Sequence, residues 1–279
     1  MIPQEVQTIE KLLGVNHEIV FSDAGHESRG YIIDDGRIVF KFPRSSKISY
    51  DNEINALNAV NALITDIGLQ RVGWTAQSNS YLGLYGVIGK AIKNLELSPA
   101  QKLNIGKRIG CFLRALHNLE VPGAPICSLA DEIKTWHDRY LPHKDFIDAN
   151  MTAIESARLH ELMMEEAPSA LMKLGDDRVF AHGDLSGNNI FLDKSGNVGL
   201  IDFSESGYLD RASDFMDIGD AEISEAMLEA YGADDTLVQK ISIRQRIRPA
   251  AILVYYRLKD DYAGSMRTVE KIRASLKTV

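Results

Sequence analysis

Residues 179–203 read VFAHGDLSGNNIFLDKSGNVGLIDF, and this stretch decides the fold of the chain. Its polar positions follow the pattern His-x-Asp-x-x-x-x-Asn, and an Asp-Phe pair comes after a further apolar segment. The apolar segments are typical of a β-hairpin, which a two-residue turn at Ser195-Gly196 would close. In that register Asn189 lies opposite Asp202 at the open end of the hairpin.

The polar residues of this stretch indicate phosphate chemistry. An amide oxygen beside a carboxylate is a typical ligand pair for Mg²⁺ shared with substrate phosphates, so we expect Asn189 and Asp202 to hold magnesium. Asp184 lies in the tight polar loop that enters the hairpin. From there its carboxylate can accept a proton from a hydroxyl brought up to the metal-bound phosphate. Together these positions have the layout used for phosphoryl transfer.

A lysine and a glutamate earlier in the chain provide a second group of this kind. Lys41 lies on the second strand of an apolar hairpin, and Glu53 lies on the apolar stripe of the helix that follows. A carboxylate on an apolar stripe is costly unless it is paired, so Lys41 is its expected partner. Such a lysine holds the α- and β-phosphates of a nucleotide, with the glutamate as its anchor.

Hydrophobic periodicity divides the chain into a sheet-rich first part and a mainly helical second part. The first part contains a helix (4–13), a hairpin closed by Asp34-Asp35-Gly36, a helix (50–64) and a strand pair (70–88). Helices are expected from the capping box at Ser98 and over 129–141, 145–173, 213–231 and 235–277. We therefore predict an α+β fold of two lobes, a small β-rich nucleotide-binding lobe at 1–88 and a larger, mostly helical catalytic and substrate-binding lobe at 89–279.

Composition and charge exclude several classes of protein. The chain is 45% hydrophobic and 25% charged, which is ordinary for a globular protein. No apolar run approaches the roughly 18 residues of a membrane span, and the first residues lack the features of a signal peptide. The two cysteines fit a reducing compartment, and a net charge of −8 disfavours nucleic acid as a partner. We expect a cytoplasmic monomer that binds neither nucleic acid nor membrane.

The sequence resembles the aminoglycoside phosphotransferases, most of all their (2″) branch, which share the protein-kinase-like fold. The resemblance is carried by VFKFPR (39–44), YLGLYGVIG (81–89), the stretch quoted above and its continuation IDFSESGYLDRASDF (201–215), and it spans nearly the whole chain. It implies a kinase that transfers the γ-phosphate of ATP or GTP to a hydroxyl of an aminoglycoside-type cationic antibiotic, with Mg²⁺ as cofactor. It also implies a role in antibiotic resistance.

The resemblance further implies a role for each residue that matches the family pattern. Asp184 is the catalytic base, and Asn189 and Asp202 are the magnesium ligands. The nucleotide-binding residues are Lys41, Glu53, Ser22, Gly25, Tyr85, Val87 and Ser186. In this group the backbone of Tyr85 and Val87 binds the purine, the turn with Ser22 and Gly25 covers the phosphates, and Ser186 approaches the terminal phosphate.

An acidic run follows the hairpin. Between Glu205 and Asp235 the chain has ten carboxylates and one cation, Arg211. Such a run is ordinarily a solvated helical face. Because this one starts directly after Asp202, it begins near the expected metal site, where acidic groups would concentrate a cationic ligand. The predicted substrate-binding residues are Asp217, Asp220 and Glu222.

Two other functions stay open on the sequence. A metabolic kinase of the same fold, acting on choline, ethanolamine, a sugar or an amino-acid hydroxyl, would use the same motifs, and choline is also a cation. A non-catalytic nucleotide-binding protein of this fold is the other alternative, although the joint presence of Lys41, Asp184, Asn189 and Asp202 argues against it. A protein kinase is disfavoured, because the segment after Asp202 is too short to dock a peptide and contains no Ala-Pro-Glu.

Overall fold

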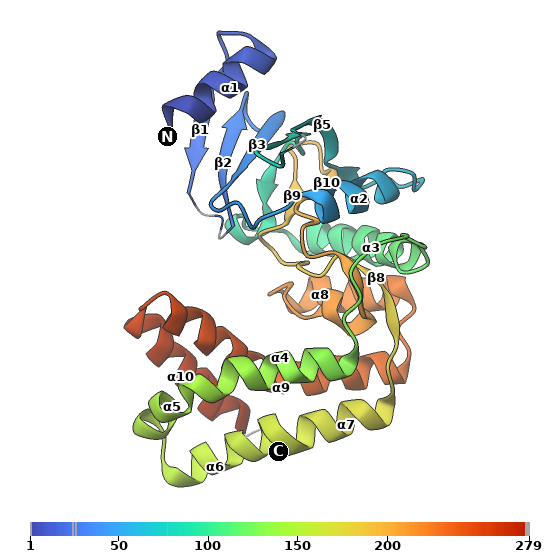
Figure 1. Cartoon of the computed structure of the whole chain (residues 1–279). Helices are drawn as coiled ribbons and strands as arrows, with labels where there is room; N and C mark the ends of the chain where they lie inside the picture. Colours follow the sequence, from blue (N-terminus) through green and yellow to red (C-terminus); the bar gives the residue numbers. More distant parts are fainter. Residues whose placement is uncertain (1, 24, 26, 77, 277–279) are drawn as a thin grey trace. The chain divides into compact units, whose positions relative to one another are not determined.

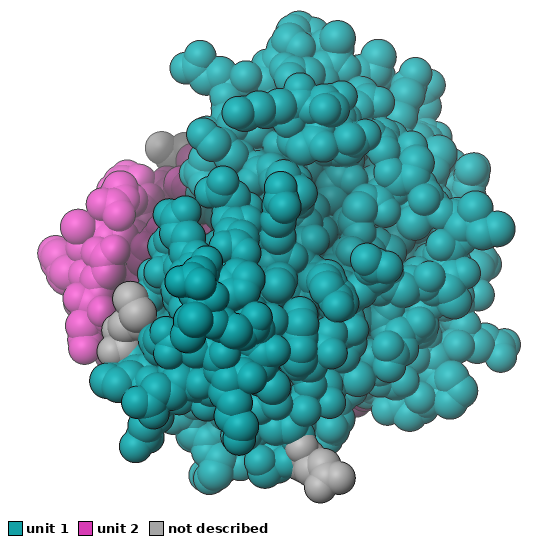
Figure 2. All heavy atoms as spheres, turned by 90° about the horizontal axis from the view of Figure 1, so that it is seen from above, with its two compact units in different colours: residues 1–125, 179–207, 217–232 teal, residues 126–178, 208–216, 233–279 magenta. Residues whose placement is uncertain are grey.

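The computed structural model describes residues 2–23, 25, 27–76 and 78–276 (Figure 1). Their contacts form two compact units, one of residues 1–125, 179–207 and 217–232 and the other of residues 126–178, 208–216 and 233–279 (Figure 2). The first unit carries the large sheets and the second is mainly helical, which confirms an α+β fold. The expected lobe boundary at 88/89 lies inside the first unit and stays a prediction. Ala24, His26, Gln77 and Lys277, on which parts of the expected elements fall, lie outside the described residues.

A five-stranded antiparallel sheet opens the first unit (Figure 1). Its strands, in spatial order, are β1 (Ile19–Ser22), β2 (Ser28–Ile33), β3 (Ile38–Pro43), β6 (Leu82–Tyr85) and β5 (Arg71–Thr75). The predicted hairpin and the predicted strand pair are both confirmed. Asp34, Asp35 and Gly36 all have positive φ, which is the backbone conformation that makes aspartate and glycine common in such a turn.

The two faces of β3 differ as its alternating pattern predicts. Phe40 and Phe42 are buried in a cluster with Tyr31 of β2 and Ile9 of α1 (Pro3–Leu13). Lys41 points to the opposite face, because successive side chains of a strand alternate. The helix α1 therefore covers one face of the sheet (Figure 1). Lys41 lies on the other face.

A second sheet contains the hairpin of residues 190–200. Its strands, in spatial order, are β4 (Gly68–Leu69), β10 (Val198–Leu200), β9 (Ile190–Leu192) and β7 (Lys90–Ala91). The expected register is wrong by one residue, because Leu200 pairs with Ile190 and the Ile201 N–H donates to the Asn189 carbonyl at 3.0 Å. Asn189 is therefore opposite Ile201, one position before Asp202.

The turn explains this shift in register. The Asp193 N–H donates to the Asn197 carbonyl at 3.0 Å, so three residues and not two form the loop. The last of them, Gly196, has φ +82°, a left-handed conformation that glycine adopts without a steric penalty. A three-residue loop with a left-handed glycine is a common hairpin connection.

Besides α1, the described helices of the first unit are α2 (Asp51–Val60), α3 (Pro99–Leu116) and α8 (Ala221–Tyr231), with a 3₁₀ turn at Ile92–Asn94. The capping box predicted at the start of α3 is confirmed, with Ser98 and Gln101 bonded to each other's backbone. Gly106 and Gly110 of α3 allow α8 to approach closely, since a Cβ on Gly110 would lie 2.3 Å from the Met227 carbonyl oxygen.

Two expected helices of this part are wrong at their ends. The helix expected over 50–64 ends at Val60, and the next side chain, Asn61, donates to the carbonyls of Leu57 and Gln70. The helix expected over 213–231 begins only after Asp220, whose carboxylate accepts the Ile223 N–H. Residues Arg211–Phe215 form a separate 3₁₀ turn.

The second unit contains most of the remaining helices. They are α4 (Leu129–Tyr140), α5 (Lys144–Asn150), α6 (Ala153–Glu161), α7 (Ala167–Leu174), α9 (Asp235–Leu258) and α10 (Tyr262–Leu276), with a 3₁₀ turn at Leu141–His143 and a π-helical turn at Leu162–Glu166. The continuous helix expected over 145–173 is wrong, because Thr152 and Glu155 form a capping box that starts α6. The helix expected over 235–277 breaks at Asp260, which has φ +53°.

Two short strands, β8 (Arg178–Ala181) and β11 (Gly207–Asp210), complete the described elements. The core of the second unit contains Leu159, Leu253 and Val269, all at most 1% exposed. Within the part of the chain that the structure describes, no helix is both long enough and apolar enough to cross a membrane.

Candidate active site

The loop between β8 and β9 is anchored by a fully buried histidine. His182 accepts the Asp184 N–H at its Nδ1, 3.3 Å away, which leaves the hydrogen on Nε2 to be donated to the Ile201 carbonyl at 3.1 Å. Its ring lies 4.4 Å from that of Phe203, measured between centroids. These contacts tie the backbone of Asp184 to the residues on either side of Asp202.

Asn189 joins Asp184 within the same loop. Its Nδ2 donates to the Asp184 carboxylate and to the Asp184 carbonyl, both at 2.8 Å. The amide oxygen of Asn189 is then the atom that can bind a cation. Asp184 is solvent-exposed, yet desolvation by the surrounding protein raises its pKa above the ordinary value. A raised pKa makes this carboxylate a stronger proton acceptor.

Lys41 contacts two carboxylates. Its Nζ donates to Glu53 Oε1 at 2.7 Å and to Asp202 Oδ1 at 2.9 Å. The predicted contact between Lys41 and Glu53 is therefore confirmed, and Glu53 is only 2% exposed. The contact between Lys41 and Asp202 was not predicted. This contact joins β3 of the five-stranded sheet to the residue that follows β10.

The charges of these three residues stabilise one another. Burial alone would lower the pKa of Lys41, but the carboxylates of Glu53 and Asp202 reverse this and raise it. Burial alone would raise the pKa of Asp202, but Lys41 and the Ser204 hydroxyl hold it below the ordinary value. Lys41 is therefore a fixed positive charge and Asp202 a fixed negative one.

Gln70 is a residue of this site that the sequence gave no reason to select. It is 3% exposed, and its Oε1 accepts the Asp202 N–H at 2.9 Å. Asp202 has φ +67°, an uncommon backbone conformation for a residue other than glycine. No local sequence signal marks Gln70, because its partner is distant in the chain.

The apolar residues beside Lys41 form a second group that was not predicted. Val39 pairs with Ile32, and Ile32 pairs with Val20, so the three lie in one row across the sheet. They share the face of Lys41, and Val20 is 51% and Ile32 36% exposed. Exposed apolar side chains beside Lys41, the lysine predicted to bind phosphates, are suited to contact a nucleotide base. The sequence contained a signal for this group, because side chains alternate along β3 and Val39 therefore lies on the same face as Lys41.

The predicted hinge residues lie at the end of β6. Gly86 approaches the hairpin turn closely, since a Cβ on it would lie 1.8 Å from the Gly36 carbonyl oxygen. Val87 packs on β10, where a Cβ on Gly199 would lie 2.1 Å from its side chain. The segment from Tyr85 to Val87 is thus fixed between the turn after β2 and the strand that precedes Asp202.

The residues predicted to approach the phosphates lie on two segments. Ser22 pairs with Gly30, which pairs with Lys41, so Ser22 is in the row and on the face of Lys41. The Gly25 carbonyl accepts a hydrogen bond from Arg44 Nε at 3.0 Å. Ser186 lies within the Asp184 loop, where its carbonyl accepts the Asn189 N–H at 2.9 Å.

The three predicted substrate-binding carboxylates have different surroundings. Asp217 forms a backbone bridge with Ser186, and its charge is one of the causes that raise the pKa of Asp184. Asp220 and Glu222, by contrast, both pair with Lys102 at 2.9 Å, and Asp220 also caps α8. The structure therefore brings Asp217 to the loop and places the other two in an ion-pair cluster.

The donor set fits a magnesium ion shared with phosphates. In the described residues, no three His, Cys, Asp or Glu side chains are grouped so as to hold a metal by themselves. Asn189 and Asp202 offer an amide and a carboxylate oxygen, which are hard ligands of the kind Mg²⁺ prefers. Such a site is completed by substrate phosphates and water, and the positive charge of Lys41 beside Asp202 matches phosphate binding.

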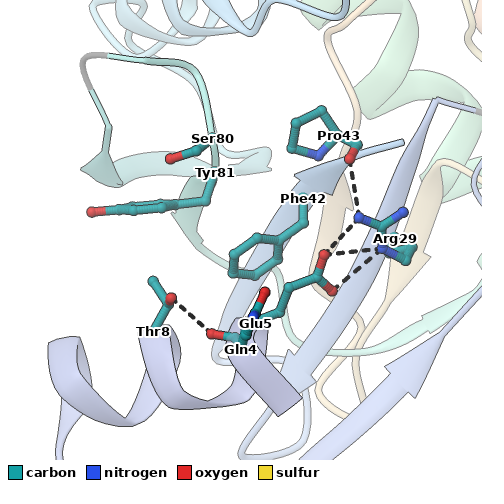
Figure 3. A pocket seen from close by; sticks show the side chains of 8 residues that line it. All are labelled: Gln4, Glu5, Thr8, Arg29, Phe42, Pro43, Ser80 and Tyr81. Atoms are coloured by element: carbon teal, nitrogen blue, oxygen red, sulfur yellow. Dashed lines mark hydrogen bonds and ion pairs between the residues drawn. The ribbon is translucent and has the colours of Figure 1, made fainter. Parts of the chain in front are cut away.

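A cavity of about 450 Å³ on the other face of the sheet does not belong to this site (Figure 3). Phe42 and Tyr81 line it, together with Glu5 of α1 and Arg29 of β2. The Glu5 carboxylate accepts hydrogen bonds there from Arg29 Nη2 and from the Tyr31 hydroxyl, both at 2.6 Å. This cavity contains an internal ion pair and none of the predicted site residues.

The sequence pattern of the phosphotransferase enzyme family matches residues 18–249, and this range contains all the predicted site residues. The chain belongs to the phosphotransferase enzyme family. Among its relatives is the aminoglycoside 3′-phosphotransferase of Niallia circulans, which is 28% identical over 166 residues, 55% of this chain. The matched part covers 61% of that relative, so the chain spans less than two thirds of its length.

Solved structures of phosphotransferases share the fold of this family member over nearly all of the chain. Aminoglycoside phosphotransferase APH(2″)-Ib with ADP bound superposes with a TM-score of 0.74 at 16% identity, covering 99% of this chain and 98% of that one. Macrolide 2′-phosphotransferase MphH of Brachybacterium faecium superposes with a TM-score of 0.66 at 14% identity, covering 99% of both chains. These likenesses confirm the predicted protein-kinase-like fold.

Proposed function

We propose that this phosphotransferase is a small-molecule kinase that transfers the γ-phosphate of ATP or GTP to a hydroxyl of an aminoglycoside-type cationic antibiotic. The observation that carries the proposal is the pair of contacts from Lys41 Nζ to Glu53 and Asp202, formed close to the loop of Asp184 and Asn189. The relative from Niallia circulans and the ADP-bound structure, both named as aminoglycoside phosphotransferases, support the substrate class.

The residues divide the work of phosphoryl transfer among them. Lys41 binds the α- and β-phosphate oxygens, and Glu53 keeps its ammonium group in place. Asn189 and Asp202 hold Mg²⁺, which when bound with the nucleotide neutralises charge on the phosphates. Asp184 orients the acceptor hydroxyl and accepts its proton, a task that its raised pKa favours. Positioning and fixed charges supply the rate, with little covalent chemistry by the protein.

The nucleotide base has a separate binding surface in this proposal. The row of Val20, Ile32 and Val39 contacts the flat face of the purine, and backbone groups of Tyr85 and Val87 contact its edge. Ser22, Gly25 and Ser186 approach the phosphates. We propose further that the protein is a cytoplasmic monomer that binds neither nucleic acid nor membrane. The acidic composition argues against nucleic acid, and the free cysteines Cys111 and Cys127 agree with a reducing compartment.

Turnover with a panel of acceptors tests this function. ATP and GTP hydrolysis would be measured separately with several aminoglycosides, a macrolide, choline, ethanolamine and simple sugars. We expect one aminoglycoside to stimulate turnover and to be phosphorylated itself, as read by mass spectrometry. Slow turnover that does not depend on the acceptor would contradict the proposed substrate class.

The variant Asp184→Asn provides the blank for this assay. Loss of a positioned base costs roughly 10²- to 10⁴-fold in rate, so we expect a loss in that range. Asp193→Asn is the matched control, because Asp193 lies in the hairpin that follows the Asp184 loop and its carboxylate accepts hydrogen bonds from its own turn, at Ser195 and Asn197. Parent-like activity in Asp184→Asn would refute the assignment of the base.

One observation favours the alternative of a metabolic kinase. Lys102 pairs with both Asp220 and Glu222 and offsets one of their two negative charges, whereas Asp217 is the predicted acidic residue beside the Asp184 loop. With two of the three predicted carboxylates engaged by a lysine, the acidic surface is weaker than the sequence predicts, which suits an acceptor with one positive charge, such as choline, better than a polyamine sugar. Selective stimulation by choline or ethanolamine in the same panel would establish this alternative.

A further inference from the structure

The segment that follows β10 is held by side-chain amides from outside it. The Asp202 N–H donates to Gln70 Oε1 at 2.9 Å. Asn52 Nδ2 donates to the Ser204 carbonyl at 2.7 Å and to the Ser206 carbonyl at 2.9 Å. Backbone groups on both sides of Phe203 are thus bonded to side chains that come from other parts of the first unit.

Both amides depend on α2. Asn52 is in its first turn. At its other end, Asn61 Nδ2 donates at 2.8 Å both to the Leu57 carbonyl and to the Gln70 carbonyl, which fixes the backbone of Gln70 against the helix. Glu53, in the first turn, bonds to Lys41 and through it to the Asp202 carboxylate. One helix therefore reaches residues 202–206 by three separate routes.

The backbone of Asp202 needs such support. Its φ of +67° places it in the left-handed region, which is sterically unfavourable for a residue with a side chain. Without the Gln70 acceptor, the Asp202 N–H would lose its partner, and the peptide could relax to an ordinary conformation. Such a change rotates the Cα–Cβ bond and moves the carboxylate away from Lys41.

We propose that Gln70 and Asn52 are positioning residues that clamp residues 202–206 to α2 and hold Asp202 in the one conformation that presents its carboxylate to a metal–phosphate group. The proposal rests on the function proposed above, because it gives Asp202 the role of a cation ligand. Partners that orient a metal ligand typically change metal affinity 10- to 100-fold when they are removed. The clamp consists of hydrogen bonds between neutral side-chain amides and backbone groups.

The first test measures the clamp without nucleotide or metal. Gln70→Met keeps the length of the side chain but cannot accept the Asp202 N–H, and Asn52→Leu cannot donate to the two carbonyls. Asn55→Leu is the matched control, because Asn55 lies on the same helix and its Nδ2 donates to the Pro122 carbonyl at 3.1 Å instead. We expect amide hydrogen exchange over residues 202–206 to be at least about tenfold faster in the first two variants and unchanged in the control.

The second test measures metal affinity. ADP binding would be titrated with Mg²⁺ in the parent and in the three variants. We expect the Mg²⁺ concentration at half-saturation to rise about tenfold in Gln70→Met and Asn52→Leu, with the affinity for metal-free ADP unchanged. A general loss of structure would weaken both kinds of binding, and thermal unfolding of each variant shows whether that has happened.

The outcomes separate the clamp from the proposed function. Parent-like exchange and parent-like Mg²⁺ dependence in both variants would overturn the clamp. If the parent itself binds ADP without any Mg²⁺ dependence, the proposed function fails, and the claim that the clamp presents a metal ligand fails with it, even where exchange is faster. If Gln70→Met does not fold, Asn52→Leu decides by the same two measurements.

Discussion

At the scale of single residues, the site depends on the position of one ammonium group between two carboxylates. Lys41 Nζ is 2.7 Å from Glu53 and 2.9 Å from Asp202. The two carboxylates attract the ammonium group in different directions, so each limits how far it moves towards the other. Glu53 was predictable because an acidic residue on an apolar stripe needs a partner. Gln70 was not predictable, since a single buried amide has no sequence pattern.

Replacing Glu53 by Gln tests this balance. The variant keeps the size of the side chain but removes its charge, so Lys41 is drawn towards Asp202 and away from the phosphates. A hydrogen bond to a charged group contributes about 1.5–3 kcal/mol, so we expect kcat/KM for the nucleotide to fall roughly 10- to 100-fold. Steady-state kinetics would measure it. Asp51→Asn, at an exposed position on the same helix, should leave kcat/KM unchanged, and an equal loss in both variants would contradict the model of Lys41 as a shared cation.

At the scale of elements, hairpin turns set the registers that place site residues. The Asp34-Asp35-Gly36 turn sets β3 against β2, and the three-residue turn at 194–196 shifts Asn189 to face Ile201. The periodicity of single strands was readable from the sequence. The exact register of the second hairpin was not, because two- and three-residue loops differ by one residue and contain the same Ser-Gly pair.

The β2–β3 turn has a titratable contact that can be tested by pH. His17 Nδ1 lies 2.7 Å from Asp34 Oδ2, which raises the pKa of His17, while the same contact lowers the pKa of Asp34. A raised histidine pKa stabilises the fold below the unfolded value of about 6.5, and this contribution is lost as the pH rises through the folded pKa. The lowered pKa of Asp34 stabilises the fold above its unfolded value of roughly 4 and is lost in acid.

The stabilisation is therefore greatest between these limits. We expect His17→Gln to lower Tm more at pH 5.5 than at pH 8.5, as measured by differential scanning calorimetry of parent and variant at both values. An equal loss of Tm at the two pH values would show that the contact does not depend on the charge of His17.

At the scale of the whole molecule, the second unit has its own core and its own buried charges. Lys240 of α9 is completely buried and lies 2.6 Å from Asp210 of β11. Arg244, one turn further along α9, forms two bonds to Glu132 of α4 at 2.8 and 3.1 Å. The sequence did not predict these buried ion pairs, because Lys240 and Arg244 have the spacing of an ordinary polar stripe on a helix.

Removing one charge from this network is expected to be costly. Lys240→Met leaves the Asp210 carboxylate buried without its closest cation, and breaking a buried pair in this way costs roughly 3–5 kcal/mol. Chemical denaturation would show the loss in the free energy of unfolding. Asp210→Asn added to Lys240→Met should recover part of it, since no uncompensated charge then remains. A single variant as stable as the parent would contradict this role of the pair.

From the sequence one could predict the residues of the proposed phosphoryl-transfer site and the elements on which they lie. Strand alternation, capping residues and the spacing of Asp184, Asn189 and Asp202 are local properties, so they can be read from neighbouring positions. Contacts between residues far apart in the chain became known only from the folded structure: Lys41 with Asp202, Gln70 with the Asp202 backbone, and Lys102 with Asp220 and Glu222. The folded structure also decided where the long predicted helices break. These outcomes depend on the packing of distant segments and on exact register, which no single stretch of sequence contains.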